Sequence, residues 1–380
     1  MICILSMLEQ NPIDTVTPML DADINSDRLV VAIFDKQAYL FERIKKVLQP
    51  RGIKVSCVFL PEEITTEALV SFFEEVFTKE LLEADTSEVV FNASGGAKRY
   101  LLAASEVSHQ LGLSSFVIEP CCDELYWLRP RLRENGNLAD KIGLKDYLFL
   151  NGYDVELSAQ NELNRPELNE TVRLWAKYCQ DSEHAMRKLN YLAYTARDNL
   201  ISAPWSANED NDFRLAGIIK QAQEQGLLRV YNSALHFSSE EARFYLNGGW
   251  LEALVFSEIS KIKRENPILQ DAQQSLVVRQ SANNNVTCNE LDVIALANNK
   301  LHIIECKTKH FKQGNGNDVV YKIDSLADAL GGLQARGAIV TFHQINQSTR
   351  DRAKLLSIRI FEPIHLPRLY YHLSEWIKLA

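Results

Sequence analysis

The stretch NELDVIALANNKLHIIECKTK, residues 289–309, decides how the C-terminal third of this 380-residue chain folds. Two apolar runs flank Asn298 and Asn299. Asparagine tolerates the positive φ angles that a two-residue hairpin turn requires. With such a turn, Ala297 pairs with Lys300, and the sequence predicts a β-hairpin in a defined register.

This register brings charged residues together on one face of the hairpin. Asp292 falls opposite Glu305, and Glu290 falls opposite Lys307. Cross-strand partners have Cβ atoms about 5 Å apart, and alternation points all four side chains the same way. The opposite, apolar face is expected to hold the intervening residues Leu291, Val293, Ile304 and Cys306.

Two carboxylates held side by side repel each other unless a positive charge lies between them. A hard divalent cation such as Mg²⁺ or Mn²⁺ prefers oxygen ligands and keeps water molecules for chemistry. Lys307, two residues after Glu305, can orient a water molecule or stabilise developing charge. These parts suffice for phosphodiester hydrolysis. The alternative is an exposed hairpin that carries only a Glu290–Lys307 ion pair.

The surrounding pattern predicts the order helix, three strands, helix, strand. The expected segments are 250–263, 276–280, 290–297, 300–309, 319–330 and 337–342, with a Gly-rich loop at 313–317. With ELDV and IIECK inside it, this αβββαβ unit resembles the PD-(D/E)xK nuclease superfamily, although the proline before Asp292 is absent. The resemblance implies that Asp292, Glu305 and Lys307 are catalytic. It adds Glu252 from the preceding helix, so that Asp292, Glu305 and Glu252 bind the metal; a surface acid is the alternative for Glu252.

The first 130 residues alternate apolar, strand-like runs with helical patterns, which predicts a mostly parallel sheet covered by helices on both faces. Ligands of such sheets bind beyond the carboxyl ends of the strands. At that position stands FNASGGAKRYLLAA, residues 91–104. Backbone N–H groups at a helix N-terminus attract phosphates. The GxxxxGK[ST] and GxGxxG patterns are absent, and a capped βα turn is the alternative.

This loop resembles the Asn-x-[Ser/Thr]-Gly-Gly-x-Lys motif of CARF domains, the Rossmann-like sensors of CRISPR systems. The matching residues are Asn92, Ser94, Gly95, Gly96 and Lys98. The resemblance implies a cyclic oligoadenylate ligand, with cyclic tetra-adenylate favoured, bound across a homodimer interface. The loop after the first strand adds Ser6 and Gln10 as expected contacts.

The strand alternation is expected to stop between residues 141 and 247. Helical patterns cover 168–179, 183–200 and 212–225, and two short strands follow at 227–231 and 234–237. This order resembles a winged helix-turn-helix. The sequence therefore predicts three domains: CARF-like 1–140, winged-helix-like 141–247 and restriction-endonuclease-like 248–380.

The composition of the chain argues against several other classes of protein. The net charge of −9 argues against a general nucleic-acid coat protein, but residues 300–380 hold twelve Lys and Arg against seven Asp and Glu. No segment approaches the roughly 20 apolar residues needed to span a bilayer. Seven cysteines without a CxxC pair make disulfides and structural zinc improbable and fit a reducing cytoplasm.

The resemblances together imply an antiviral effector of type III CRISPR defence: a metal-dependent endonuclease that cyclic oligoadenylate switches on and that cuts DNA, RNA or both. One alternative is a ligand-responsive transcription regulator with an inert nuclease fold. Another is a DNA-repair or restriction nuclease that no ligand switches. A third possibility is that the N-terminal domain also hydrolyses its ligand.

Overall fold

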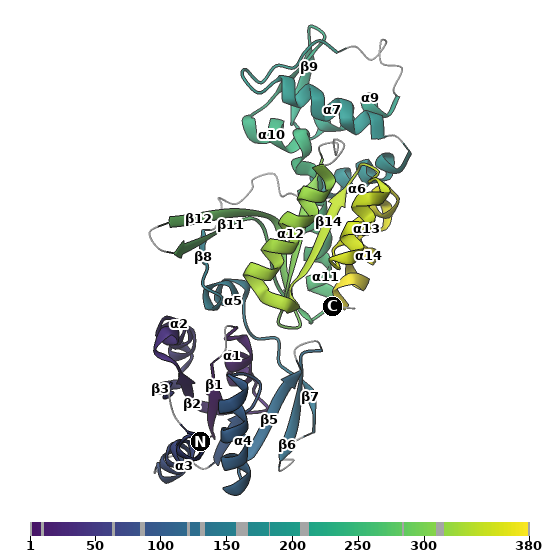
Figure 1. The fold of residues 1–380 in the computed structure, drawn as a ribbon. Coiled ribbons are helices and arrows are strands. Elements are labelled where there is room, and N and C mark those ends of the chain that lie inside the picture. The colour runs from purple at the N-terminus through teal and green to yellow at the C-terminus, as the bar shows by residue number, and fades with distance from the viewer. Residues whose placement is uncertain are drawn as a thin grey trace.

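The computed structural model describes residues 2–378, except 9–10, 63–64, 84–87, 120–121, 130–133, 157–165, 182, 206–212, 283–284 and 309–314. The molecule is elongated (Figure 1). The N-terminal sheet lies at one end of the molecule, and the C-terminal sheet occupies the middle. A small helical part, which we call the helical lobe, lies at the other end. The lobe comprises α7, α9, β9, β10 and α10.

The N-terminal part is a seven-stranded sheet in the order β3-β2-β1-β4-β5-β6-β7. Strands β1 to β5 are parallel, and β6 and β7 add antiparallel. The predicted Rossmann-like fold is therefore confirmed. Its elements are β1 (Ile2–Met7), α1 (Ile13–Leu20), β2 (Ser26–Ile33), α2 (Ala38–Leu48), β3 (Lys54–Phe59), α3 (Thr66–Leu82), β4 (Glu88–Asn92), α4 (Lys98–Gln110), β5 (Ser114–Glu119), β6 (Glu124–Arg129) and β7 (Gly136–Asn137).

Helix α1 was not expected from the sequence. It contains Pro18 and the β-branched residues Thr15, Val16 and Thr17, all of which lower helix propensity. Six of its eight residues are buried, so packing between β1 and β2 outweighs the poor local preference.

The middle segment contains one strand, β8 (Asp154–Glu156), that was not expected where the strand alternation stops after residue 141. Strand β8 pairs with β11 and so extends the C-terminal sheet. Helix α6 packs against α11 of that same part. The helical lobe contains the expected two-stranded hairpin, β9–β10, and its winged-helix-like character stays a prediction. The elements are α5 (Leu144–Leu150), β8 (Asp154–Glu156), α6 (Pro166–Asp181), α7 (Glu183–Thr195), α9 (Phe213–Glu224), β9 (Leu228–Tyr231), β10 (Ala234–Phe237) and α10 (Glu240–Phe244).

The C-terminal part has the predicted order α11-β11-β12-β13-α12-β14, so the αβββαβ core is confirmed. Its six-stranded sheet has the order β15-β14-β13-β12-β11-β8. Strand β11 is much longer than the expected segment 276–280. The elements are α11 (Trp250–Glu265), β11 (Leu269–Ala282), β12 (Asn285–Ala297), β13 (Lys300–Lys307), α12 (Asn315–Gly331), β14 (Arg336–Thr341), α13 (Gln347–Leu355), β15 (Arg359–Phe361) and α14 (Leu369–Lys378).

The hairpin turn has the predicted register. Ala297 pairs with Lys300. Asn298 and Asn299 have φ angles of 47° and 54°, as a type I′ turn requires. These values confirm the turn chemistry read from the sequence.

Asn299 also connects this turn to two other segments. Its N–H donates to Gln270 Oε1 at 2.8 Å, and Gln270 Nε2 returns a bond to Asn299 Oδ1 at 2.9 Å. Asn299 Nδ2 donates to Asp123 Oδ2 in the N-terminal part at 2.9 Å. Burial raises the pKa of Asp123 to about 8, with a smaller contribution from Asp140 and an opposing one from the Asn299 amide.

One apolar cluster passes through this junction. It runs from α1 and α2 through Tyr147 and Leu148 of α5 to Leu291, Ile294 and Leu301 of the C-terminal sheet. The N-terminal and C-terminal sheets are therefore joined by a continuous core.

We expect Asn299→Gly to lower the free energy of unfolding by about 1–3 kcal/mol, because buried Asp123 loses its amide donor and Gln270 Nε2 keeps only the carbonyl of Ile142 as its acceptor. Glycine keeps the positive φ, so the loss reports the side-chain bonds alone. Urea denaturation at neutral pH measures it. The control, Asn298→Gly, should change stability by less than about 0.5 kcal/mol. Equal stability of both variants would contradict the assigned role of Asn299.

Candidate functional site

Strands β12 and β13 stop pairing at the position of the predicted acids. The pairing runs from Ala297↔Lys300 to Val293↔Ile304. Asp292 and Glu305 are the next residues on the two strands. The carboxylate of Asp292 accepts a hydrogen bond at 2.7 Å from the backbone N–H of Cys306, the residue after Glu305. The two acids therefore flank the point where the strands separate.

The strict alternation expected for β12 is wrong at this point. Leu291 packs with Ile294 and Leu296, whereas Val293 belongs to the other core cluster. On β11, Gln274 pairs with Val293 and Leu276 pairs with Leu291, and Ser275 between them has a φ of 51°. A left-handed residue inside a strand rotates the chain locally. The change of face occurs at Asp292.

Glu305 is buried, with 1% of its surface exposed, and two lysines neutralise it. Lys307 forms an ion pair with one carboxylate oxygen of Glu305. Lys322 of α12 donates to both oxygens, at 2.9 and 3.0 Å. The expected pairing of Lys307 with Glu290 is thus replaced by pairing with Glu305, and Glu290 is exposed.

Sequence reasoning missed Lys322. The one available signal was that α12 carries a single basic residue among Asp318, Asp324 and Asp328. Helical spacing cannot show that this residue reaches a strand 17 positions earlier, because only the packing of α12 on β13 brings them together.

Glu252 lies in the first turn of α11, and its pKa is raised to about 8. Burial is the main cause, followed by the charges of Asp292, Glu290 and Glu305. The pKa of Asp292 is raised to about 6 by burial and by Glu305, against the opposing Cys306 N–H. Burial would lower the pKa of Lys307, but Glu305 raises it. The structure therefore brings together all four residues that the sequence selected.

The carboxylates of Asp292, Glu305 and Glu252 partly fit a divalent cation. Carboxylates whose pKa values rise through mutual repulsion gain most from a positive ion. Within the described ranges, however, no group of three or more His, Cys, Asp and Glu side chains is arranged to hold a metal ion. The reason is visible in the contacts: Glu305 is turned toward Lys307 and Lys322, and Asp292 toward a backbone N–H. Mg²⁺ needs only one or two protein carboxylates, and Asp292 and Glu305 can supply them.

A tight backbone contact places α11 beside β13. Gly248, in the π-helical turn Tyr245–Gly249, has a φ of 128°. A Cβ there would lie 2.3 Å from Oγ1 of Thr308, the residue after Lys307. Glycine is required at this position because the helix that carries Glu252 approaches the end of β13 so closely.

The loop after β4 is held by its own side chains. Asn92 Oδ1 accepts from the N–H and the hydroxyl of Ser94, at 3.0 and 2.5 Å, and Asn92 Nδ2 donates to the backbone carbonyl of Asp14 in α1 at 2.8 Å. Gly96 has a φ of 112°, and a Cβ there would lie 2.8 Å from Met7 Cβ. Gly95 is half-buried and Lys98 is exposed at the start of α4. The loop is therefore compact at the carboxyl end of β4.

Ser6 and Gln10 are the two ligand contacts expected from the end of the first strand and the loop after it. Ser6 is buried, with 1% exposed, and shares a hydrogen bond of 3.2 Å with Thr15. Its hydroxyl supports α1 from within the core. Gln10 lies outside the described residues.

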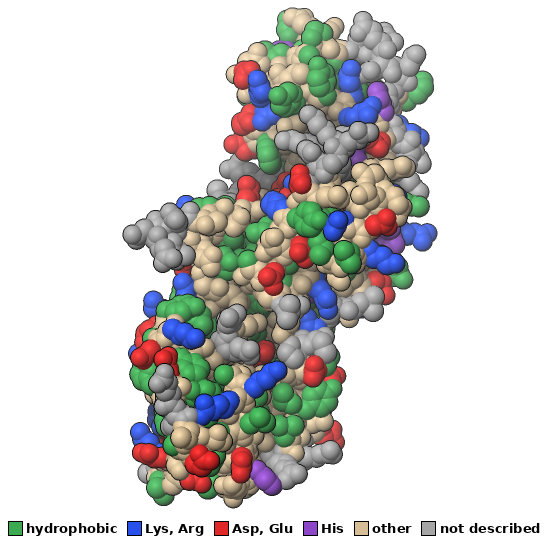
Figure 2. Space-filling view, in the orientation of Figure 1, with side chains coloured by type: hydrophobic (Ala, Val, Ile, Leu, Met, Phe, Trp, Pro, Cys, Tyr) green, Lys and Arg blue, Asp and Glu red, His purple; other side chains and the backbone are tan. Residues whose placement is uncertain are grey.

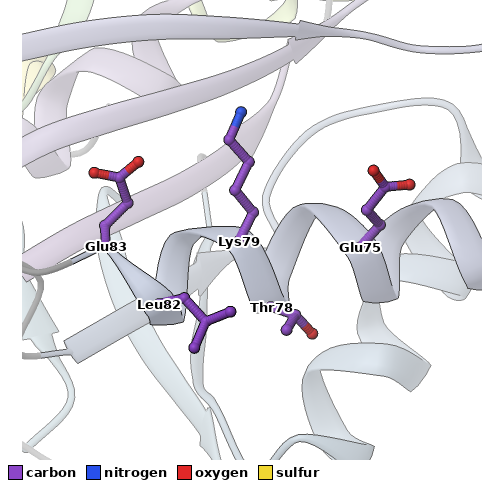
Figure 3. A pocket seen from close by; sticks show the side chains of 5 residues that line it. All are labelled: Glu75, Thr78, Lys79, Leu82 and Glu83. Carbon is purple, nitrogen blue, oxygen red and sulfur yellow. The ribbon is translucent and has the colours of Figure 1, made fainter.

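A surface hollow lies over the C-terminal half of α3, lined by Glu75, Thr78, Lys79, Leu82 and Glu83 (Figure 3). The end of α3 precedes the start of β4, so this hollow is at the amino ends of the strands. Ligands of parallel sheets bind at the other end, where the Asn92 loop lies. Figure 2 shows Lys and Arg interspersed with Asp and Glu over the visible face of the molecule.

Comparison with known proteins identifies the family. The model of the Card1-like endonuclease domain matches residues 239–380. The crystal structure of protein VC1899 from Vibrio cholerae is 34% identical to the chain, covers 100% of it and 98% of its own length, and has a TM-score of 0.91. The chain belongs to the same family as VC1899 and carries a Card1-like endonuclease domain. No match was found among curated proteins.

Two further structures share the fold of this Card1-like protein. Can2 from Sulfobacillus thermosulfidooxidans, solved with cyclic tetra-adenylate, is 20% identical, covers 99% of both chains and has a TM-score of 0.79. A type III CRISPR defence DNA nuclease activated by cyclic oligoadenylate is 13% identical, covers 96% of this chain and 51% of its own, and has a TM-score of 0.57. These two structures bear out the fold that the resemblance to CARF-domain effector nucleases implied. No helix in the described ranges is long and apolar enough to cross a membrane.

We expect Glu252→Gln to stabilise the metal-free protein at alkaline pH. The pKa of Glu252 rises from 4.5 to about 8 on folding, so its favourable contribution is complete below pH 4.5 and is lost as the pH rises through about 8. A glutamine at this position has no proton to lose, so the variant keeps its stability as the pH rises. Its free energy of unfolding at pH 9 should exceed that of the parent by on the order of 1–3 kcal/mol.

Urea denaturation in EDTA from pH 4 to pH 9 measures this difference. Glu375→Gln, at a half-buried acid of α14 that pairs with Lys378, serves as the control and should leave the pH profile unchanged. A Glu252→Gln profile that runs parallel to that of the parent would show that Glu252 is not held among the other carboxylates.

Proposed function

We propose that this protein is a metal-dependent endonuclease that cyclic oligoadenylate, with cyclic tetra-adenylate as the favoured activator, switches on in type III CRISPR defence. The observation that carries the proposal is the cluster of Asp292, Glu305 and Glu252 with Lys307 at the fork of β12 and β13. The Card1-like endonuclease match covers this cluster, and the Can2 structure with cyclic tetra-adenylate supports the choice of activator.

In this proposal Asp292 and Glu305 bind Mg²⁺ or Mn²⁺, with Glu252 as the third carboxylate. A cation held by these carboxylates would lower the pKa of a water molecule and neutralise charge on the phosphodiester. Lys307 holds its ammonium beside Glu305 and donates hydrogen bonds to water or to the phosphate. Lys322 contacts both oxygens of Glu305 and positions that carboxylate.

The N-terminal part acts as the sensor. Asn92 fixes the loop through Ser94 and through the carbonyl of Asp14, which leaves the half-buried glycines and exposed Lys98 at the carboxyl edge of the sheet. Backbone N–H groups at the start of α4 and the Lys98 ammonium suit the phosphates of a cyclic oligonucleotide. A homodimer places two such loops together, so ligand binding favours one arrangement of the pair.

The experiment that tests the function is cleavage of supercoiled plasmid, single-stranded DNA and RNA, with and without Mg²⁺ or Mn²⁺ and cyclic tetra-adenylate. Cleavage should require both the metal and the nucleotide. Asp292→Asn and Lys307→Ala should each lower the rate at least about 100-fold, because each removes charge stabilisation at the reacting phosphate. Glu375→Gln should cleave like the parent.

Two outcomes would redirect the assignment. Cleavage without the nucleotide would favour an unswitched nuclease. Absence of cleavage by folded protein, with metal-free binding to a defined duplex, would favour a transcription regulator.

We expect Lys98→Ala to weaken binding of cyclic tetra-adenylate roughly tenfold, since a hydrogen bond to a charged group contributes about 1.5–3 kcal/mol. Titration calorimetry measures the change. Lys79→Ala, an exposed lysine on α3, is the control and should bind as the parent does. Unchanged affinity of Lys98→Ala would remove this residue from the ligand site.

A further inference from the structure

Helix α7 of the helical lobe is docked on the chain that follows Lys307. The imidazole of His343 lies between Glu183 at the start of α7 and the carbonyl oxygen of Thr308, with Nδ1 2.7 Å from Glu183 Oε1 and Nε2 2.9 Å from Thr308 O. Asn190, two turns along α7, donates to the same carbonyl at 3.4 Å. Two residues of α7 therefore reach the end of the strand that carries Glu305 and Lys307.

The spacing of these contacts fixes which face of α7 borders the candidate active site. Residues three or four apart in a helix lie on one stripe. Glu183, Arg187, Asn190 and Tyr194 follow this spacing. Arg187 lies between the two docking residues and is exposed. Its guanidinium therefore belongs to the face of α7 that adjoins Thr308.

Aromatic rings continue this face. Tyr191 and Tyr194 are 55% and 52% exposed. The Arg197 guanidinium lies 5.2 Å from the ring centre of Tyr194 and donates to its hydroxyl at 3.0 Å. Figure 2 shows Lys and Arg beside hydrophobic side chains on the helical lobe, with Asp and Glu among them. The described part of α7 carries one acid, Glu183, which His343 already engages, and Arg197, which follows the helix, lies 3.6 Å from the carboxylate of Asp198.

We propose that this stripe, Arg187, Tyr191, Tyr194 and Arg197, binds a nucleic-acid strand with unpaired bases and guides it to the candidate active site. The inference rests on the proposed nuclease function and assigns the surface that holds its substrate. A row of rings and cations matches a strand in which bases alternate with phosphates, because tyrosine stacks on any base and arginine pairs with phosphate. In a duplex the bases are stacked on each other and present no free face to the rings.

Continuity with the site favours nucleic acid over a protein partner. The stripe begins one helical turn from Glu183, and Glu183 is linked through His343 to Thr308, the residue after Lys307. A strand on α7 would therefore pass directly to the carboxylate cluster.

The test measures binding separately from cleavage. Full-length protein carrying Asp292→Asn, with cyclic tetra-adenylate present, is titrated into fluorescently labelled oligothymidylate of about 12 nucleotides, a length typical of single-strand sites. An abasic strand of the same length carries the same phosphates without bases. Fluorescence anisotropy gives both dissociation constants.

Added to this background, Tyr191→Ala and Tyr194→Ala should each weaken oligothymidylate binding roughly tenfold, because stacking on one aromatic side chain contributes about 1–3 kcal/mol per base. The dissociation constant for the abasic strand should stay within about twofold of that of the background protein. Tyr191→Phe keeps the ring and should bind as the background protein does. Arg187→Ala should weaken binding of both strands and reduce the slope of log affinity against log salt concentration by about 0.7.

The matched control is Tyr371→Ala on α14, a tyrosine that is 59% exposed. It should change neither dissociation constant. Thermal unfolding establishes that each variant is folded. The inference would be overturned if the alanine variants of Tyr191 and Tyr194 bind oligothymidylate as tightly as the control. It would also be overturned if they lose affinity for both strands equally. Failure of the Asp292→Asn protein to bind either strand would overturn the inference, whereas cleavage of plasmid by the parent protein would retain the nuclease proposal.

Discussion

The register of the Asn298-Asn299 turn is the constraint on which the C-terminal site depends. Both residues adopt positive φ angles, and the turn pairs Ala297 with Lys300. A slip of one position would move every side chain of one strand to the other face, so Asp292 would no longer lie beside Glu305. Gln270 and Asp123 hold Asn299 from both sides, which fixes the turn against the N-terminal part. One buried amide therefore serves the register of the hairpin and the attachment of the two sheets.

Electrostatics governs the other end of the same hairpin. Glu252, Asp292 and Glu305 approach one another in a buried setting, which raises the pKa values of Glu252 and Asp292. Lys307 and Lys322 offset this repulsion by engaging Glu305. The cluster therefore carries unbalanced negative charge on Glu252 and Asp292 once their protons leave, and this charge suits a cation. The break in alternation at Asp292 makes the meeting possible, because acids from β12, β13 and α11 reach one point.

The Asn92 loop and the β12–β13 hairpin are attached to one continuous core. Asn92 bonds to the backbone of α1, and α1 belongs to the apolar cluster that continues into β12 and β13. The helical lobe is attached at the opposite end, through Glu183, His343 and Thr308. The candidate active site thus lies in the part of the molecule that contacts both neighbours.

The sequence by itself determined what depends on short-range pattern. The αβββαβ order, the parallel N-terminal sheet, the asparagine turn and the grouping of Asp292, Glu305 and Lys307 all follow from periodicity and turn chemistry. Only the tertiary structure decided the rest. Helix α1 forms because burial outweighs Pro18, β8 joins a sheet more than 100 residues away in sequence, and Ser6 is buried under α1. Lys322 and His343 reach the end of β13 through packing that no local spacing encodes. Local preference is set by neighbours in the chain, whereas these contacts join residues that are distant in sequence, and only the assembled core fixes their distances.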